Sequence, residues 1–90
     1  MPNESRESLL EFPCDFPIKI TGKNTIEFQR EIMEIINQHI PEKKRKDYSE
    51  QLSRNQNYLA ITIVANFNNQ EELDSVYRAI TAAKTVLMAL

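Results

Sequence analysis

The sequence predicts a single α+β domain folded as a two-layer βαββαβ sandwich, the ferredoxin-like arrangement. A chain of 90 residues has room for one modest core. In some segments apolar and polar residues alternate, as in strands with one buried face. Two other segments repeat apolar residues at helical spacing. In chain order these segments form two β–α–β units. Such units interleave into a four-stranded antiparallel sheet with both helices on one face.

The first unit begins with a strand over 16–21, in which Phe16, Ile18 and Ile20 alternate with polar residues. Gly22, the only glycine of the chain, is predicted to end it. Asn24 is the expected N-cap of a helix that Pro41 stops. The apolar stripe of this helix consists of Phe28, Ile32, Ile35, Ile36 and Ile40.

The second unit begins with a weak, half-polar strand over 48–52, after a charged connection at 42–47. A polar turn at 53–57 leads to the clearest strand pattern, over 59–67. Asn69 is the expected cap of a second helix, whose apolar stripe is Leu73, Val76, Tyr77 and Ile80. The apolar run 85–90 is the fourth strand.

Composition limits where the domain works and what it binds. Residues 1–8 are expected to be a flexible tail, and residues 9–90 the domain. A single cysteine, Cys14, cannot form an internal disulfide, which favours a reducing, cytoplasmic location. We find no signal-peptide pattern and no apolar run long enough to span a membrane. The net charge of −2 argues against binding to nucleic acid or to an anionic membrane.

The predicted sheet order places strands 16–21 and 59–67 in the centre and the other two at the edges. The edge run 85–90 is apolar on both faces, which is unusual for a sheet with one solvated face. We therefore expect a homodimer or a protein partner here, with an interface formed by Val64, Val86, Met88 and Leu90. In the alternative, Leu9, Leu10 and Phe12 fold back over the same patch.

Several short motifs resemble those of a known family. The opening Leu9-Leu10-Glu11-Phe12-Pro13, followed by Phe16, Lys19 and Gly22, and the ending with Val86, Met88 and Leu90, are similar to the YbeD-like family of small bacterial proteins. The resemblance implies a ferredoxin-like fold similar to the ACT regulatory domains of metabolic enzymes, and no known catalysis. It implies a regulatory role toward a small metabolite or an enzyme. ACT domains that bind amino acids typically have an Asp and a proline between the first strand and the first helix. The corresponding segment of this chain, Gly22–Ile26, contains neither residue.

The sequence contains few residues that could support catalysis or bind a metal ion. Cys14 and His39 are the only cysteine and histidine, and an acid, Asp15, stands beside the thiol. One Cys and one His cannot supply a zinc site, and a single glycine cannot build a phosphate-binding loop. RNA stacking needs aromatic residues where the central strand has Ala60, Thr62 and Val64. We therefore expect no cofactor, no metal and no enzyme activity.

Two function hypotheses remain. In the first, a small anionic metabolite binds at Gly22, Lys23, Asn24 and Thr25, where the glycine turn and the amides of the helix start lie beside a lysine. In the second, the chain has no ligand and docks on a metabolic enzyme through its sheet edge or through a basic loop at 43–46, with Lys44 and Arg45 as the contact residues. The ordinary alternatives are a capped helix start and a solvated loop.

Overall fold

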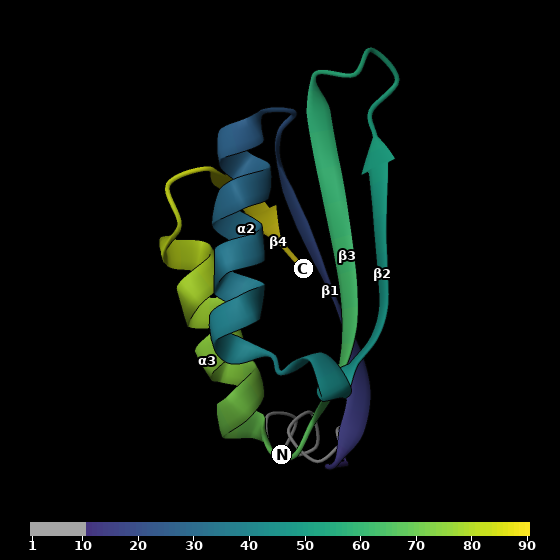
Figure 1. The fold of residues 1–90 in the computed structure, drawn as a ribbon, viewed down its shortest axis with the longest axis vertical. Helices are drawn as coiled ribbons and strands as arrows, with labels where there is room; N and C mark the ends of the chain where they lie inside the picture. Colours follow the sequence, from purple (N-terminus) through teal and green to yellow (C-terminus); the bar gives the residue numbers. More distant parts are fainter. Residues whose placement is uncertain (1–10) are drawn as a thin grey trace, which may run out of the picture.

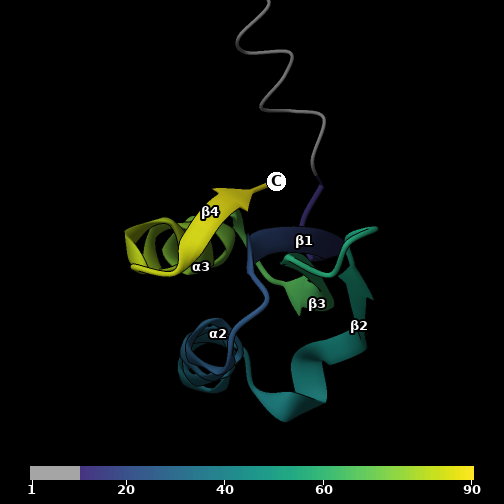
Figure 2. The ribbon, with the colours of Figure 1, turned by 90° about the horizontal axis from the view of Figure 1, so that it is seen from above.

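The computed structural model describes residues 11–90 and confirms the predicted α+β sandwich. Two helices cover one face of a four-stranded antiparallel sheet (Figures 1 and 2). The strands lie in the order β2-β3-β1-β4, so the predicted central and edge strands are confirmed. The elements are β1 (Cys14–Lys23), α2 (Ile26–His39), a 3-10 turn (Glu42–Lys44), β2 (Arg45–Leu52), β3 (Tyr58–Phe67), α3 (Gln70–Ala82) and β4 (Val86–Ala89).

Alternation along the two central strands builds the core. Ile18 and Ile20 of β1 pair with Ile63 and Ile61 of β3, and all four side chains are buried beneath the helices. Each helix contributes the apolar stripe expected from its spacing, with Phe28 and Ile32 from α2 fully buried. Phe12 is half-buried against this core. Leu9 and Leu10, which were expected to fold over the sheet with Phe12, lie outside the described residues, as does the predicted tail at 1–8.

Several predicted boundaries need correction. Gly22 does not end β1, which continues to Lys23 because β3 pairs with it along its whole length. The N-cap of α2 is Thr25 rather than Asn24: the Thr25 hydroxyl accepts a hydrogen bond from the Phe28 amide at 3.1 Å. Asn24 instead bonds the 53–57 turn, since its side chain donates to the Gln56 carbonyl.

The charged connection at 42–47 is also more ordered than its sequence indicates. It forms one 3-10 turn and then the first residues of β2, which starts at Arg45 rather than Tyr48. The predicted cap of the second helix is confirmed, because the Asn69 side chain accepts from the Glu72 amide at 2.9 Å. No helix of the described part is long and apolar enough to cross a membrane.

Candidate functional site

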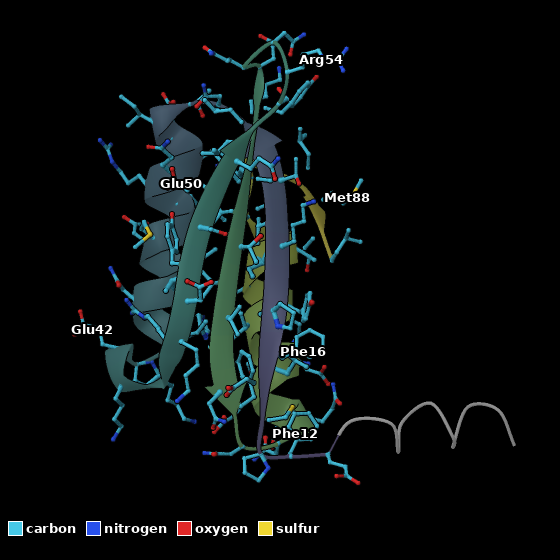
Figure 3. The ribbon with its side chains drawn as sticks, turned by 90° about the vertical axis from the view of Figure 1, so that its right-hand side faces the viewer. Phe12, Phe16, Glu42, Glu50, Arg54 and Met88 are labelled. Carbon is cyan, nitrogen blue, oxygen red and sulfur yellow. The ribbon has the colours of Figure 1, made fainter. Side chains whose placement is uncertain are left out.

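The uncovered face of the sheet, called here the outer face, is the first candidate surface. It is formed by the odd-numbered residues 15–23 of β1, by the residues paired with them on β3 and β2, and by Met88 and Leu90 beside β1. Figure 3 views the sheet from this side, with the helices behind it and Met88 at the β4 edge. No helix among residues 11–90 lies on this face.

The β4 edge exposes large apolar side chains at one side of the outer face. Leu87, Met88 and Leu90 are 59%, 56% and 67% exposed. Val86, which the sequence analysis placed in the same interface, instead lies opposite Gly22 and packs against the core. The reason is an irregularity in the β1–β4 register between Thr21 and Gly22, which no sequence pattern reveals. Leu87 is the interface candidate that sequence reasoning missed.

The centre of the outer face carries small side chains. Val64 is half-buried opposite Pro17, and Thr62 and Ala60 follow along β3 opposite Lys19 and Thr21. A shallow hollow of about 270 Å³ lies over Thr21, Ala60 and Tyr58. The predicted interface residue Val64 therefore belongs to this face, together with Met88 and Leu90.

The second candidate is a polar hollow at the start of α2. Lys23, Asn24 and Thr25 line it together with residues 56–58 of the hairpin, and its volume is about 380 Å³. The Asn24 amide donates to the Asn57 carbonyl at 2.9 Å, which joins the two sides. Three of the four predicted ligand residues therefore lie in one hollow, against a hairpin that sequence reasoning did not connect with them.

Gly22, the fourth predicted ligand residue, does not line this hollow and has a packing role. It is buried, and a Cβ placed there would lie 2.5 Å from two ring carbons of Phe28 and 2.7 Å from the Thr85 carbonyl oxygen. The glycine lets β1 approach the first turn of α2 and the segment before β4. A Gly22→Val variant would therefore disturb the core and could not test ligand binding.

The basic segment at 43–46 is not a free loop. The Lys44 ammonium pairs with the Glu72 carboxylate of α3 at 3.1 Å. Arg45 donates from Nε to the Ile40 carbonyl at 2.9 Å and from Nη2 to Asn37 Oδ1 at 3.1 Å. Arg45 thus binds the C-terminal end of α2, where the helix dipole favours a cation, and Lys44 is held by the Glu72 carboxylate in the first turn of α3.

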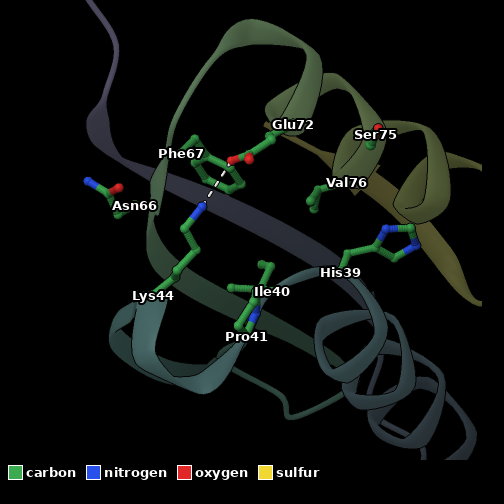
Figure 4. Close-up of a pocket in the computed structure, with 9 residues that line it drawn as sticks. All are labelled: His39, Ile40, Pro41, Lys44, Asn66, Phe67, Glu72, Ser75 and Val76. Carbon is green, nitrogen blue, oxygen red and sulfur yellow. Dashed lines mark hydrogen bonds and ion pairs between the residues drawn. The ribbon is translucent and has the colours of Figure 1, made fainter.

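The Lys44–Glu72 pair crosses a hollow of about 260 Å³ between the end of α2 and the start of α3 (Figure 4). Buried Ile40, Phe67 and Val76 form its apolar lining, and His39 lies at its rim. The Asn68 amide and Lys44 hold the pKa of the Glu72 carboxyl below its usual range, since both favour the charged form. The ion pair joins the 3-10 turn to α3 across this hollow. The charges of Lys44 and Glu72 therefore pair with each other and are not free.

A more apolar groove of about 310 Å³ lies between α2 and β2. Met33 and Ile36 line its helix side, and Tyr48 and Ile63 its strand side. Burial, together with the hydrogen bond to Glu50 at 2.7 Å, raises the pKa of Tyr48 to about 12. Tyr48 therefore stays a neutral, amphipathic wall of the groove.

Cys14 and His39 do not line any of these hollows together. His39 borders the hollow of Figure 4, but Cys14 is not among its lining residues. Within residues 11–90, no three His, Cys, Asp or Glu side chains form a group that could hold a metal ion.

The fold belongs to the class of small ACT-like sandwiches. The ACT domain of the GTP pyrophosphokinase of Chlorobium tepidum matches with a TM-score of 0.69 and 13% identity over 86% of this chain and 97% of that domain. Protein HP0495 from H. pylori matches with a TM-score of 0.72 and 16% identity over 100% of this chain and 94% of that protein. At these identities the likeness shows the fold alone.

The sequence comparisons give the family. The chain belongs to DUF493, a family of proteins of unknown function, whose model matches residues 7–90. A UPF0250 protein of Neisseria gonorrhoeae is 36% identical over 97% of this chain and 96% of its own length. A UPF0250 protein of Ralstonia nicotianae is 39% identical over 94% of this chain and 88% of its own length. The resemblance to the YbeD-like proteins is thereby confirmed.

Proposed function

We propose that this chain is a small, non-catalytic adaptor or regulatory module that docks on another protein through the apolar edge of its sheet at β4. One observation carries the proposal: Leu87, Met88 and Leu90, three large apolar side chains in four residues, are each more than half exposed. Exposed apolar clusters on an edge strand favour pairing with another chain, because burial removes apolar surface from water.

The opposite edge of the sheet supports the choice of β4. Strand β2 exposes charged residues, among them Lys46, Asp47 and Glu50, and its register shifts between Arg45 and Asp47. Charges and register shifts are features that protect an edge strand against pairing. The described strand β4 carries no charged side chain.

The docking surface is better placed at β4 than at the basic segment. Lys44 and Arg45 are engaged by Glu72 and by the end of α2, so their charges are partly satisfied inside the chain. We propose an enzyme as the partner, by analogy with the ACT domain from GTP pyrophosphokinase, which is by its name part of an enzyme.

Affinity capture with matched variants tests this function. A Leu87→Ser/Met88→Ser variant should lose an enzyme that the wild-type chain retains, with at least a tenfold fall in recovered partner, equivalent to about 1.4 kcal/mol. The control is Ile26→Ser, which removes an equally exposed apolar side chain (68%) at the start of α2. Equal retention by the wild type and the β4 variant would refute docking through this edge.

A second candidate function is sensing of a small anionic metabolite in the hollow formed by Lys23, Asn24 and Thr25 with the hairpin. The observation in its favour is that these three residues, one of them a lysine, line a hollow of about 380 Å³ together with residues 56–58. Glu27, in the first turn of α2, works against an anion because its carboxylate lies close to the same helix start.

Thermal unfolding against amino acids, organic acids, nucleotides and lipoate tests the second candidate. A ligand at about 100 times its Kd stabilises by about 2.7 kcal/mol, and each kcal/mol shifts the midpoint by about 4–8 °C in a domain of this size. Lys23→Gln should remove the shift while leaving the unliganded midpoint nearly unchanged, because Lys23 is exposed. A flat response across the panel would end this candidate.

A further inference from the structure

The shallow hollow on the outer face, called here the outer hollow, combines a cation, an aromatic ring and polar side chains. Its volume is about 270 Å³, and it lies toward the hairpin that carries Arg54 (Figure 3). Residues of β1, β3 and β2 line it, among them Lys19, Tyr58 and Gln51. No residue of β4 lines it, so the outer hollow is separate from the proposed docking edge.

The floor of the outer hollow consists of short side chains, and one wall is aromatic. Thr21 and Ala60 lie opposite each other on β1 and β3, and Tyr58 lies in the next outward-facing row of β3. Tyr58 is 44% exposed, so its ring is accessible. A planar ring that lies over Ala60 can therefore stack on Tyr58. The sequence offers no aromatic residue at 60, 62 or 64, and the structure supplies one from position 58.

The charge around the outer hollow is positive. Lys19 lines the hollow, and Lys23 lies opposite Tyr58 at its far end. Both lysines are exposed, and neither forms an ion pair with another residue of the part that the structure describes. The three outward-facing rows from Lys19 to Lys23 contain no acidic side chain on the described strands. An anion beside Lys19 would therefore meet an ammonium whose charge is not compensated.

Two polar side chains flank the floor of the outer hollow. Thr21 and Gln51 lie in one row, on either side of Ala60. The Gln51 amide can both donate to and accept from the edge of a heterocyclic ring, and the Thr21 hydroxyl can donate to a sugar or phosphate oxygen. The hollow thus has groups suited to a ring edge, a ring face and an anion.

We propose that the outer hollow binds a nucleoside monophosphate. The base lies over Ala60 and stacks on Tyr58, the Gln51 amide hydrogen-bonds the edge of the base, and the phosphate binds Lys19. The hollow is close to the lower limit of about 300 Å³ for ligand pockets, so it suits a molecule with a single ring system. This site differs from the polar hollow of the second candidate function, because Tyr58 is the only residue that lines both.

The rest of the outer face favours a mononucleotide over a nucleic acid strand. Asp15 and Asp47 are exposed in the outward-facing rows at the other end of the face. A longer phosphate backbone that followed the strands would meet these carboxylates. Among small ligands, an anion without a ring would leave the Tyr58 ring without a contact, and a neutral aromatic molecule would leave Lys19 without one.

Isothermal titration calorimetry with AMP and its two parts, adenosine and ribose 5-phosphate, tests this assignment. The wild type should bind AMP with a Kd below about 1 mM and bind each part at least about tenfold more weakly. Lys19→Gln and Tyr58→Leu should each weaken AMP binding about tenfold, whereas Tyr58→Phe should preserve it because the ring remains. Lys23→Gln is the matched control: it removes the same charge from the same strand, outside the outer hollow, and should weaken binding less than about threefold.

Several results would overturn the proposal. One is a flat titration with AMP, and another is ribose 5-phosphate binding as tightly as AMP. Loss of binding in Lys23→Gln but not in Lys19→Gln would place the ligand in the polar hollow, so the second candidate function would stand and this inference would fail. An oligonucleotide that binds more than about a hundredfold tighter than AMP would identify a nucleic-acid surface instead.

Circular dichroism checks that each variant folds. If Tyr58→Leu does not fold, Gln51→Ala, at an exposed position, replaces it and should weaken AMP binding about threefold or more. Unchanged AMP binding in both Gln51→Ala and Lys19→Gln would overturn the proposal.

Discussion

The Cα of Gly22 faces the ring of Phe28 so closely that a Cβ at position 22 would lie 2.5 Å from ring atoms Cδ1 and Cε1. The Thr85 carbonyl oxygen would lie 2.7 Å from the same Cβ, and this neighbour is backbone. The missing side chain thus brings β1, α2 and the segment before β4 together at one point. It also fixes where the start of α2 lies relative to the polar hollow.

Gly22→Ala is therefore expected to destabilise the domain although Ala is the smallest possible change. Overpacking of a close-packed core costs about 1–3 kcal/mol, and the contact with backbone limits relaxation. Urea unfolding monitored by circular dichroism measures the loss. Adding Phe28→Leu should recover only part of it, since the clash with Thr85 remains. A Gly22→Ala variant as stable as the wild type would contradict this packing.

Glu31 joins α2 to the segment before β4. Its carboxylate accepts hydrogen bonds from the Lys84 and Thr85 amides and from the Thr85 hydroxyl. The hydrogen bond from the Thr85 hydroxyl, followed by the bond from the Thr85 amide, holds the pKa of the Glu31 carboxyl below its usual range, because both favour the charged form. Glu31→Gln should cost about 1 kcal/mol at neutral pH, because charge-assisted bonds at a partly exposed site are lost.

The pH dependence of that difference follows from the sign of the shift. The folded state favours the carboxylate, so the contribution of Glu31 is fully present above the unfolded pKa and is lost as pH falls through the lowered folded pKa. Chemical unfolding of wild type and Glu31→Gln between neutral and acidic pH should show two stabilities that converge in acid. Glu34→Gln, an exposed change on the same helix, is the control and should follow the wild type.

Arg45 closes the C-terminal end of α2 through a forked set of bonds. Its guanidinium donates to the carbonyls of Ile40 and Ile36 and to the Asn37 side chain. Arg45→Ala should cost about 1–2 kcal/mol and increase amide exchange in the last turn of α2. Arg45→Lys should restore little, since an ammonium cannot reproduce the planar fork. Full rescue by lysine would show that charge alone is sufficient.

Gln56 in the hairpin has a φ of 65°, a left-handed backbone conformation that favours glycine. Its carbonyl accepts the Asn24 side chain, so the hairpin conformation and the polar hollow are linked. Gln56→Gly should relieve this conformation but should also add conformational entropy to the unfolded chain. The expected net result is a domain more stable by about 0.5–1 kcal/mol. Thermal unfolding measures the change. The control, Asn55→Gly, lies in the same hairpin without a positive φ and should destabilise.

Side-chain periodicity alone was enough to predict the architecture. Alternation around Ile18 and Ile20 and the helical spacing of Phe28 and Ile32 are consequences of burying one face of each element, so they are written into the chain. Boundaries were less certain. Asn24 and Thr25 are both good caps, and pairing with the distant hairpin at Gln56 and Asn57 decided between them.

The candidate sites depended more on contacts between distant residues. Sequence reasoning joined Lys23, Asn24 and Thr25, which are neighbours, but not the hairpin across from them. The basic segment was predicted to be available to a partner protein, because Glu72, which pairs with Lys44, lies 28 residues farther along the chain.

By itself, then, the sequence determined the βαββαβ order, the central strands and the apolar character of the last strand, since these follow from local periodicity. Only the tertiary structure decided which side chains of that strand face water. The register irregularity turns Val86 inward and leaves Leu87 exposed, and register is set by pairing between strands far apart in the chain. The same pairing brings Asp47 of β2 into one row with Val64 and Pro17, because a charge acquires its neighbours on a sheet only when the strands are in place.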